Sequence, residues 1–414
     1  MKTNTKFLFT LLLTLGSFSS YAQIPPPDYY LKDVILNFKD SNFSESGIKN
    51  YQSYYLSFIG EYQQAIKTMD EIYDNKCKEK LSTADSAVFV NTYKAIDATD
   101  YILKRTKSKK LVMINESHNM PQQRAYMITL LRKLYDQGYR YLGMEALWDA
   151  DTLPNKRGYP ILGAGCLLTE PVMGNVAREA MKIGFRVFSY EMDFREETVP
   201  YNSEYVGWVG GGQGLEREIR QAFNVMKVFH ADTTAKVILF AGLGHITRGW
   251  NDWSMGTFIW RFLGSKNRPL SIDQCRMVER SDTAIENSYF LLANVNKPTV
   301  FVDTANVSFI NAYNPNVIDI QVFHPRTKYI AARPDWLYQL DRTPYYTDTK
   351  KHKMYYPFLV KAYCKGEDIT KAVPYDVIQL NDKKEKKPLL LEKGSYILEL
   401  KNDTQKEVFE IEIK

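Results

Sequence analysis

Acidic residues and histidines follow four short apolar runs in the middle of the chain, and their chemistry suits the activation of water. A histidine oriented by a carboxylate can take a proton from water near neutral pH. Such residues follow the runs 111–115, 139–144, 186–190 and 236–241, in this order: Glu116 and His118, Glu145, Glu191 and Asp193, and His245. A hydrolytic site is therefore predicted, provided that the fold brings the ends of the four runs together.

The residue types suggest a division of roles within this site. We expect His118 to be the general base, with Glu116 or Glu145 orienting its ring. His245 would stabilise the negative charge that develops on a substrate oxygen. Supporting or substrate-binding roles are expected for Arg124, Glu191, Asp193 and Arg248. Structural roles stay open for the acids, which could instead cap helices or pair with the arginines.

The same residue types are also compatible with a metal site. His118, His245 and Glu145 could be three ligands of a divalent metal ion, with water as the fourth. A bound metal ion would then activate the water in place of a histidine. The residues alone leave both routes open.

The four apolar runs have the length of buried strands, and helical patterns lie between them. The segment 119–138 shows this best, because Asn119 can cap a helix, Pro121 suits its first turn and Gly138 can end it. Alternation of strand and helix implies right-handed crossovers and an α/β fold with a mostly parallel sheet flanked by helices. In such a sheet ligands bind at the carboxyl ends of the strands. Further strands are expected at 270–273, 299–302 and 317–323.

Composition changes along the chain predict the following organisation. A helical N-terminal region is expected over 23–108, the α/β domain over 109–345, and a small β-sandwich-like domain over 355–414. In the last of these, short apolar runs alternate with charged or glycine-containing turns, a pattern typical of antiparallel strands.

Residues 1–22 have the pattern of a secretory signal peptide. A basic head is followed by the apolar run 7–15 and by small residues that end at Ala22. We therefore expect cleavage near Ala22 and a periplasmic or secreted protein without a transmembrane segment. Export permits disulfides, but the spacing of the four cysteines, Cys77, Cys166, Cys275 and Cys364, does not fix their pairing.

Overall composition indicates a folded protein, and we expect its partner to be a small-molecule or peptide substrate rather than a nucleic acid. The 414 residues are 44% hydrophobic and 14% aromatic, which excludes a disordered chain. The formal net charge of +6 is too small to predict nucleic-acid binding. The oligomeric state is not indicated by the sequence.

Four motifs of the middle region resemble the superfamily that joins the erythromycin esterases, the ChaN-like haem-binding proteins and the TraB/Tiki proteins. They are Asn115-Glu116-Ser117-His118 with Arg124, Gly143-Met144-Glu145, Arg217-Glu218 with Ala222 and Asn224, and Ala241-Gly242-Leu243-Gly244-His245. The resemblance covers about residues 108–280. Asn115 replaces a glycine that is usual in the family, and the Glu-x-His spacing is closest to the ChaN and Tiki branches.

This resemblance implies the same fold but leaves the reaction open. In the esterase branch, matching histidines and glutamates activate water without a metal, whereas Tiki proteins are metal-dependent peptidases and the ChaN branch binds haem. We therefore expect an exported hydrolase that uses activated water on an ester or amide. The alternative is a haem- or metal-binding carrier without turnover, with Tyr190, Tyr139 or Tyr141, His118 and His245 as candidate haem ligands.

Overall fold

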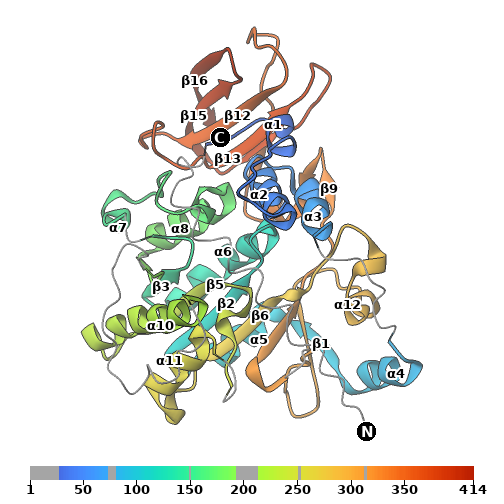
Figure 1. Ribbon diagram of the computed structural model, residues 1–414, viewed down its shortest axis with the longest axis vertical. Helices are drawn as coiled ribbons and strands as arrows, with labels where there is room; N and C mark the ends of the chain where they lie inside the picture. Colours follow the sequence, from blue (N-terminus) through green and yellow to red (C-terminus); the bar gives the residue numbers. More distant parts are fainter. Residues whose placement is uncertain (1–27, 73–80, 149–150, 193–212, 250–252, 312–314) are drawn as a thin grey trace.

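A computed structural model of the chain describes residues 28–72, 81–148, 151–192, 213–249, 253–311 and 315–414. Its centre is an eight-stranded sheet with the strand order β1-β7-β8-β6-β2-β5-β3-β4 (Figure 1). The strands are β1 (Lys94–Asp97), β2 (Leu111–Glu116), β3 (Tyr141–Met144), β4 (Arg186–Ser189), β5 (Val237–Gly242), β6 (Leu270–Met277), β7 (Thr299–Val302) and β8 (Ile320–Phe323). The predicted α/β class is confirmed.

The central strands run parallel, and they place the predicted site residues at one edge. β2 pairs in parallel with both β5 and β6, and β3 pairs in parallel with β4 and β5. Within the β2–β5 pair, Glu116 lies opposite Gly242. Every residue of β2 and β5 is buried, as expected for strands covered on both faces.

Helices cover both faces of the sheet. One apolar core joins α5, α6 and α8 to the side chains of Val112, Ile114, Ile238 and Phe240. A second core joins α10 and α11 to Leu111, Met113, Val237 and Leu239, which alternate with the first set along the same strands. The helices are α5 (Ala98–Thr106), α6 (Pro121–Asp136), α8 (Pro171–Ile183), α10 (Gln213–Ala231) and α11 (Met255–Leu263).

One edge of the sheet is antiparallel and includes part of the region that was expected to be helical. β7 pairs antiparallel with β8, and β1 pairs antiparallel with β7. β1 lies within 23–108, and the sequence pattern did not predict it. The aromatic side chain of Phe89, from α4 (Thr83–Thr92), packs nearby against Phe301 and Phe323. The short helix α12 (Ser288–Ala293) joins the same aromatic cluster.

The C-terminal part is an antiparallel strand region, as expected. Its four-stranded sheet has the order β13-β12-β15-β16, and a second, two-stranded sheet pairs β11 with β14. The strands are β11 (Thr343–Tyr345), β12 (Phe358–Cys364), β13 (Asp376–Leu380), β14 (Leu389–Leu391), β15 (Gly394–Lys401) and β16 (Lys406–Ile413). Leu389 and Leu391 share one core with the facing side chains of the larger sheet.

The first three helices pack against this C-terminal region rather than standing alone (Figure 1). Their shared core contains Tyr55 and Phe58 of α2 together with Leu359 of β12 and Val377 of β13. These helices are α1 (Lys32–Leu36), α2 (Glu45–Phe58) and α3 (Tyr62–Asp70). α2 thereby lies close enough to the central sheet for Tyr54 to contact His118.

Short elements complete the described part of the chain. They are α7 (Pro154–Arg157), α13 (Asp335–Tyr338), the two-residue strands β9 (Tyr329–Ile330) and β10 (Arg333–Pro334), and the 3-10 turns η2 (Leu167–Thr169), η3 (Leu243–Ile246), η4 (Ser265–Asn267), η5 (Thr283–Ile285) and η6 (Pro315–Val317). Among the described helices, none combines the length and the apolar character needed to cross a membrane.

Candidate functional site

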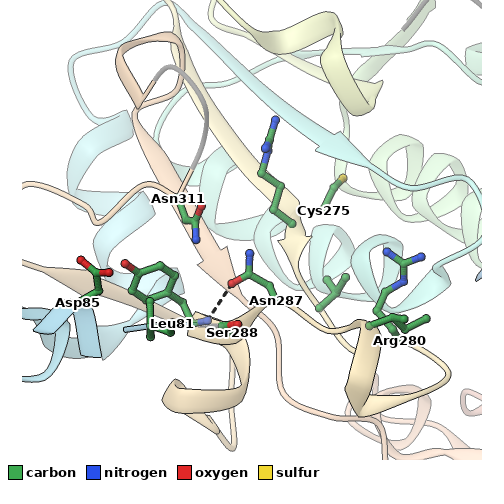
Figure 2. A pocket seen from close by; sticks show the side chains of 11 residues that line it. Leu81, Asp85, Cys275, Arg280, Asn287, Ser288 and Asn311 are labelled. Atoms are coloured by element: carbon green, nitrogen blue, oxygen red, sulfur yellow. Dashed lines mark hydrogen bonds between the residues drawn. The ribbon is translucent and has the colours of Figure 1, made fainter. Parts of the chain in front are cut away.

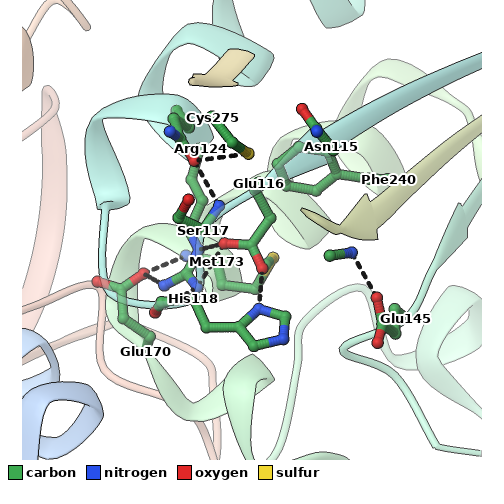
Figure 3. A network of polar contacts seen from close by, with 12 residues as sticks. Asn115, Glu116, Ser117, His118, Arg124, Glu145, Glu170, Met173, Phe240 and Cys275 are labelled. Carbon is green, nitrogen blue, oxygen red and sulfur yellow. Dashed lines mark hydrogen bonds and ion pairs between the residues drawn. The ribbon is translucent and has the colours of Figure 1, made fainter. Parts of the chain in front are cut away.

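Glu116 and His118 form a hydrogen-bonded pair at the carboxyl end of β2 (Figure 3). A Glu116 oxygen, Oε1, contacts Nδ1 of His118. The carboxylate is buried, whereas the imidazole is 15% exposed. Within the described part of the chain, Nε2 of His118 has no hydrogen-bond partner. A carboxylate on Nδ1 favours the tautomer with its proton there, so Nε2 is left with a free electron pair.

Arg124 of α6 holds Glu116 from the other side. Its Nε and Nη2 donate to Glu116 Oε2 at 2.9 and 2.7 Å, and Nη2 also donates to the His118 carbonyl oxygen at 2.8 Å. Burial raises the pKa of the Glu116 carboxyl, but Arg124 and then His118 outweigh it and hold that pKa below its usual value. Glu116 is therefore a carboxylate at neutral pH, as an orienting group must be.

A second buried acid, Glu170, completes the charge balance around Arg124. Arg124 Nη1 donates to Glu170 Oε2 at 3.0 Å, and this oxygen also accepts from the Met173 amide at the start of α8. Burial raises the pKa of Glu170, although Arg124 opposes this shift. We call Glu116, His118, Arg124 and Glu170 the His118 half of the site.

Glu145, directly after β3, is the centre of a second group. Its Oε2 accepts from the backbone amide of Gly242, and its Oε1 lies 2.7 Å from Arg217 Nη2 and 3.3 Å from His245 Nε2. Burial raises the pKa of Glu145, but His245 and Arg217 more than reverse this effect and hold it well below its usual value. Glu145 thus carries a negative charge that two cations share.

His245, in turn η3, lies between two carboxylates. Nδ1 lies 2.6 Å from Glu218 Oε1, and Nε2 lies 3.3 Å from Glu145 Oε1 and 3.2 Å from Arg217 Nη1. Burial lowers the pKa of His245, but Glu218 and Glu145 raise it to about 10. The two carboxylates thus favour the protonated imidazole at neutral pH, whereas Arg217 Nη1 opposes a proton on Nε2.

Arg217 connects Glu145 to a third acid, Glu191. Its Nε donates to Glu191 Oε1 at 2.9 Å, and Nη2 also contacts Glu191 Oε2. Gln221 Nε2 lies 3.1 Å from each of these oxygens. The carboxylates around Arg217 raise the pKa of its guanidinium against the opposing effect of burial. We call Glu145, Glu191, Arg217, Glu218 and His245 the His245 half of the site.

The two halves meet at Gly242. A β-carbon built on Gly242 would lie 2.9 Å from His118 Cε1, 3.2 Å from His118 Nε2 and 3.1 Å from Glu145 Oε2. Because both atoms lie within 3.2 Å of the same β-carbon position, His118 Nε2 and Glu145 Oε2 are close neighbours on either side of Gly242. Only glycine leaves room for both side chains here. The free nitrogen of His118 thus faces the group of charges that surrounds Glu145.

Most of the predicted site residues lie in these two halves, but two do not. Glu116, His118, Arg124, Glu145, Glu191 and His245 belong to them. Arg248 lies elsewhere, because its buried guanidinium donates to Asp319 Oδ2 at 2.7 Å and to the Pro269 carbonyl. Arg248 therefore lies outside both halves of the site. Asp193 lies outside the described residues.

The three tyrosines considered as haem ligands are hydrogen-bonded to other groups. Among the described residues, no group of three or more histidine, cysteine or acidic side chains has an arrangement that could hold a metal ion. Tyr190 donates its hydroxyl to the Phe240 carbonyl, and Tyr139 donates to the Thr106 and Lys109 carbonyls. Tyr141 bonds to Asp232 at the opposite end of β3. These tyrosines therefore do not extend the site.

Four residues of the site had no assigned role in the sequence prediction. Arg217 and Glu218 appeared in the sequence prediction only as part of the family motif. Both lie in the first part of α10, the helix that precedes β5. Glu170 and Tyr54 gave no recognisable signal. The ring of Tyr54 packs edge-on against His118, with 5.8 Å between centroids, and only the folded chain brings α2 to this position.

The cysteines that the structure describes do not form disulfides with each other. Cys166, Cys275 and Cys364 are free thiols, and Cys77 lies outside the described residues. Cys275 lies beside the His118 half, with its Sγ 3.7 Å from Gln123 Oε1. Burial raises the pKa of the Cys275 thiol well above its usual value, so it is a poor nucleophile.

Comparisons with known proteins give only distant similarities. No protein-family model matches the chain, and no curated protein matches it. The type III effector HopBA1 aligns with 55% of this chain and 94% of its own, at 11% identity and a TM-score of 0.33. ChaN of Campylobacter jejuni, described with cofacial haem binding, aligns with 56% of this chain and 97% of its own, at 8% identity and a TM-score of 0.30.

A third solved structure is similar at the same level. The C-terminal region of Pasteurella multocida toxin, described with a thiol-protease-like catalytic triad, covers 86% of this chain and 51% of its own. Its identity is 8% and its TM-score is 0.29. Such values assign neither a family nor a function, so the resemblance to the esterase and Tiki branches stays a prediction from sequence motifs.

Proposed function

We propose that this protein is an exported hydrolase in which His118 activates water to attack an ester or amide. The observation that carries the proposal is the geometry of His118. Glu116 is bound to Nδ1, Arg124 fixes Glu116, and Nε2 faces the Glu145 group without a hydrogen-bond partner among the described residues. This is the arrangement expected of a general base with an oriented ring.

The proposed reaction proceeds by addition and elimination. A water bound near Gly242 gives a proton to His118 Nε2 while its oxygen bonds to the substrate carbonyl carbon. The resulting tetrahedral intermediate carries a negative oxygen. When it collapses, the bond to the leaving group breaks and His118 returns its proton to the departing oxygen or nitrogen. The products are a carboxylic acid and an alcohol or amine.

The His245 half would stabilise the negative oxygen. His245 and Arg217 are both cationic at neutral pH, and both lie next to Glu145, opposite His118. Cations that are already held in place need little reorganisation when charge develops on the substrate. Glu191 and Glu218 balance these charges in the free protein and fix the two cations.

The test is hydrolysis by the full chain and by His118→Ala. Both proteins would be assayed against a panel of p-nitrophenyl esters and aminoacyl p-nitroanilides. For any substrate that wild type cleaves, we expect the variant to lose at least about a hundredfold in kcat/KM, because the general base is absent. Full activity of His118→Ala would refute the assignment.

His352→Ala is the matched control. His352 also bonds an acid through Nδ1, at 2.7 Å from Glu407, but it lies in the C-terminal region. Its loss should leave the rate unchanged. Metal analysis and assay after EDTA dialysis distinguish the routes: activity without bound metal supports activation by His118, whereas stoichiometric metal and loss on dialysis contradict it.

A further inference from the structure

A cavity of about 680 Å³ lies outside the proposed hydrolytic site, beside the end of β6 (Figure 2). Its other walls come from the start of α4 and from the segment that joins η5 to α12. Apolar contact area is offered by Leu81, Val278, Ile285 and Tyr289. The volume is in the range of small-molecule sites, roughly 300–1,000 Å³.

The charged groups of this cavity differ in how far they are already paired. Arg280 donates from Nε to Asp70 Oδ1 at 2.6 Å, so a buried acid neutralises it. Asp85 accepts from the hydroxyl of Ser82 at 2.6 Å. Arg276 is 51% exposed, and the one ion pair that it makes with a described residue is a long contact of 3.9 Å.

Asp273, the partner in that long contact, already has other hydrogen bonds. Its Oδ1 accepts from Asn115 Nδ2 at 2.8 Å, and its Oδ2 accepts from Gln321 Nε2 at 2.9 Å. The guanidinium of Arg276 therefore keeps donors that can bind another anion. A planar guanidinium suits carboxylate, sulfonate and phosphate groups.

We propose that this cavity binds a small amphipathic anion, in which an aromatic or aliphatic body carries a carboxylate or sulfonate group. The anionic group would bind Arg276, and the body would cover the apolar side chains of Val278, Ile285 and Tyr289. A negative group near Asp85 would be repelled, which favours the orientation with the anionic group at Arg276. This site is separate from His118 and does not depend on the proposed hydrolysis.

Cys275 marks where the cavity and the His118 half adjoin (Figures 2 and 3). Its Sγ lies 3.7 Å from Gln123 Oε1, and the same oxygen accepts from the backbone amide of Ser117. Ser117 precedes His118 in the chain. The wall of the cavity is thus one side chain away from the segment that carries the proposed base.

The experiment is a fluorescence titration of the full chain with 8-anilinonaphthalene-1-sulfonate, an aromatic sulfonate of the proposed class. Wild type, Arg276→Gln and Arg268→Gln would be compared at low and high salt. Arg268 is a matched control, because it is 43% exposed and lies 3.7 Å from Asp319. We expect saturable binding that Arg276→Gln weakens roughly tenfold, that Arg268→Gln leaves unchanged, and that salt weakens.

Two results would overturn the proposal. One is an unchanged affinity of Arg276→Gln, which would place the dye elsewhere. The other is equal weakening by Arg276→Gln and Arg268→Gln, which would mean that net charge alone sets the affinity. Circular dichroism and thermal unfolding confirm that each variant is folded, so a loss of binding is not a loss of structure.

Discussion

The two halves of the site contain the same residue types, but their surroundings give the histidines different properties. His118 has one carboxylate partner, and its second nitrogen has no hydrogen-bond partner among the described residues. His245 has a carboxylate at each nitrogen, and these raise its pKa to about 10. One ring keeps a nitrogen available to a bound water, whereas the raised pKa of the other favours its protonated form.

The difference comes from the number and the position of the arginines and acids. In the His118 half, Arg124 takes up the second oxygen of Glu116, so that a single oxygen remains for the histidine. In the His245 half, Glu145 and Glu218 approach His245 from two sides. The presence of acidic residues near a histidine therefore does not by itself make that histidine a general base. The partner of its second nitrogen decides its role.

The largest effect is expected from Glu116→Gln, compared with Glu170→Gln. Arg124 will take the amide oxygen, so the amide NH2 group faces Nδ1 and favours the wrong tautomer of His118. We therefore expect kcat/KM to fall by roughly 10²–10⁴. Because both acids bind buried Arg124, each variant should lose stability, by about 3–5 kcal/mol where an uncompensated charge is left. Glu170 does not contact His118, and its loss should cost less than about tenfold in rate.

Measurements of kcat/KM and of urea unfolding for Glu116→Gln and Glu170→Gln test whether Glu116 orients His118. A fall in rate that only tracks the loss of stability, equal for both variants, would contradict an orienting role for Glu116. A much larger fall in rate for Glu116→Gln at a similar loss of stability would support it.

His245→Gln removes the cation of the other half and should have the next largest effect. If His245 stabilises the negative oxygen, kcat should fall by about 10²–10³. Glutamine keeps the ability to donate a hydrogen bond but carries no charge. A variant with wild-type kcat would restrict His245 to a structural role, and the proposed oxyanion stabilisation would then depend on Arg217.

The raised pKa of His245 also predicts a stability that depends on pH. The ordinary pKa is 6.5 and the folded value is about 10, so protonation favours the folded state. This stabilisation is complete below about pH 6.5 and is lost as the pH rises toward 10. In that window the free energy of unfolding of wild type should fall by about 1 kcal/mol per pH unit, and that of His245→Gln should fall by less. Urea unfolding at pH 7 and 9.5 measures the difference, and equal slopes would contradict the raised pKa.

A change at the junction of the two halves should have a smaller but more specific effect. The β-carbon of Gly242→Ala would lie 2.9 Å from His118 Cε1, so the ring must shift. We expect about a hundredfold loss in kcat/KM, because a displacement of the order of 1 Å misaligns a catalytic group. Gly244→Ala is the control, since its β-carbon would meet no atom within 4 Å. Equal activity of the two variants would show that His118 is not held against Gly242.

The sheet and much of the site could be predicted because both depend on local pattern. The apolar runs before Glu116, Glu145 and His245 are strands, and parallel strands end at one edge. Gly242, the last residue of β5, was also visible as part of the motif that ends at His245. The pattern gave Glu116 as one of two candidate partners of His118, but it did not give Glu218 as the partner of His245, because Glu218 comes from α10.

The features that the pattern did not place have the same cause. Arg248 follows His245 closely in the chain, yet its side chain turns to Asp319, far along the sequence. Glu170 lies outside every motif, and it approaches Arg124 only because α8 packs against α6. β1 is short and partly exposed, so it lacks the apolar run that marks the inner strands. Tertiary contacts, rather than local propensity, place all three.

The smallest effect should come from Tyr54 of α2, whose ring contacts the proposed base. Its ring packs edge-on against His118, and such aromatic contacts contribute about 0.5–1.5 kcal/mol. Tyr54→Leu should therefore lower kcat/KM roughly two- to tenfold by loosening the imidazole, while Tyr54→Phe keeps the ring and should lose less. If both variants lose the same activity, the hydroxyl rather than the ring is important. A loss confined to Tyr54→Leu would show that the His118 half needs a wall from outside the α/β sheet, whereas the His245 half is built from the sheet and its own helices.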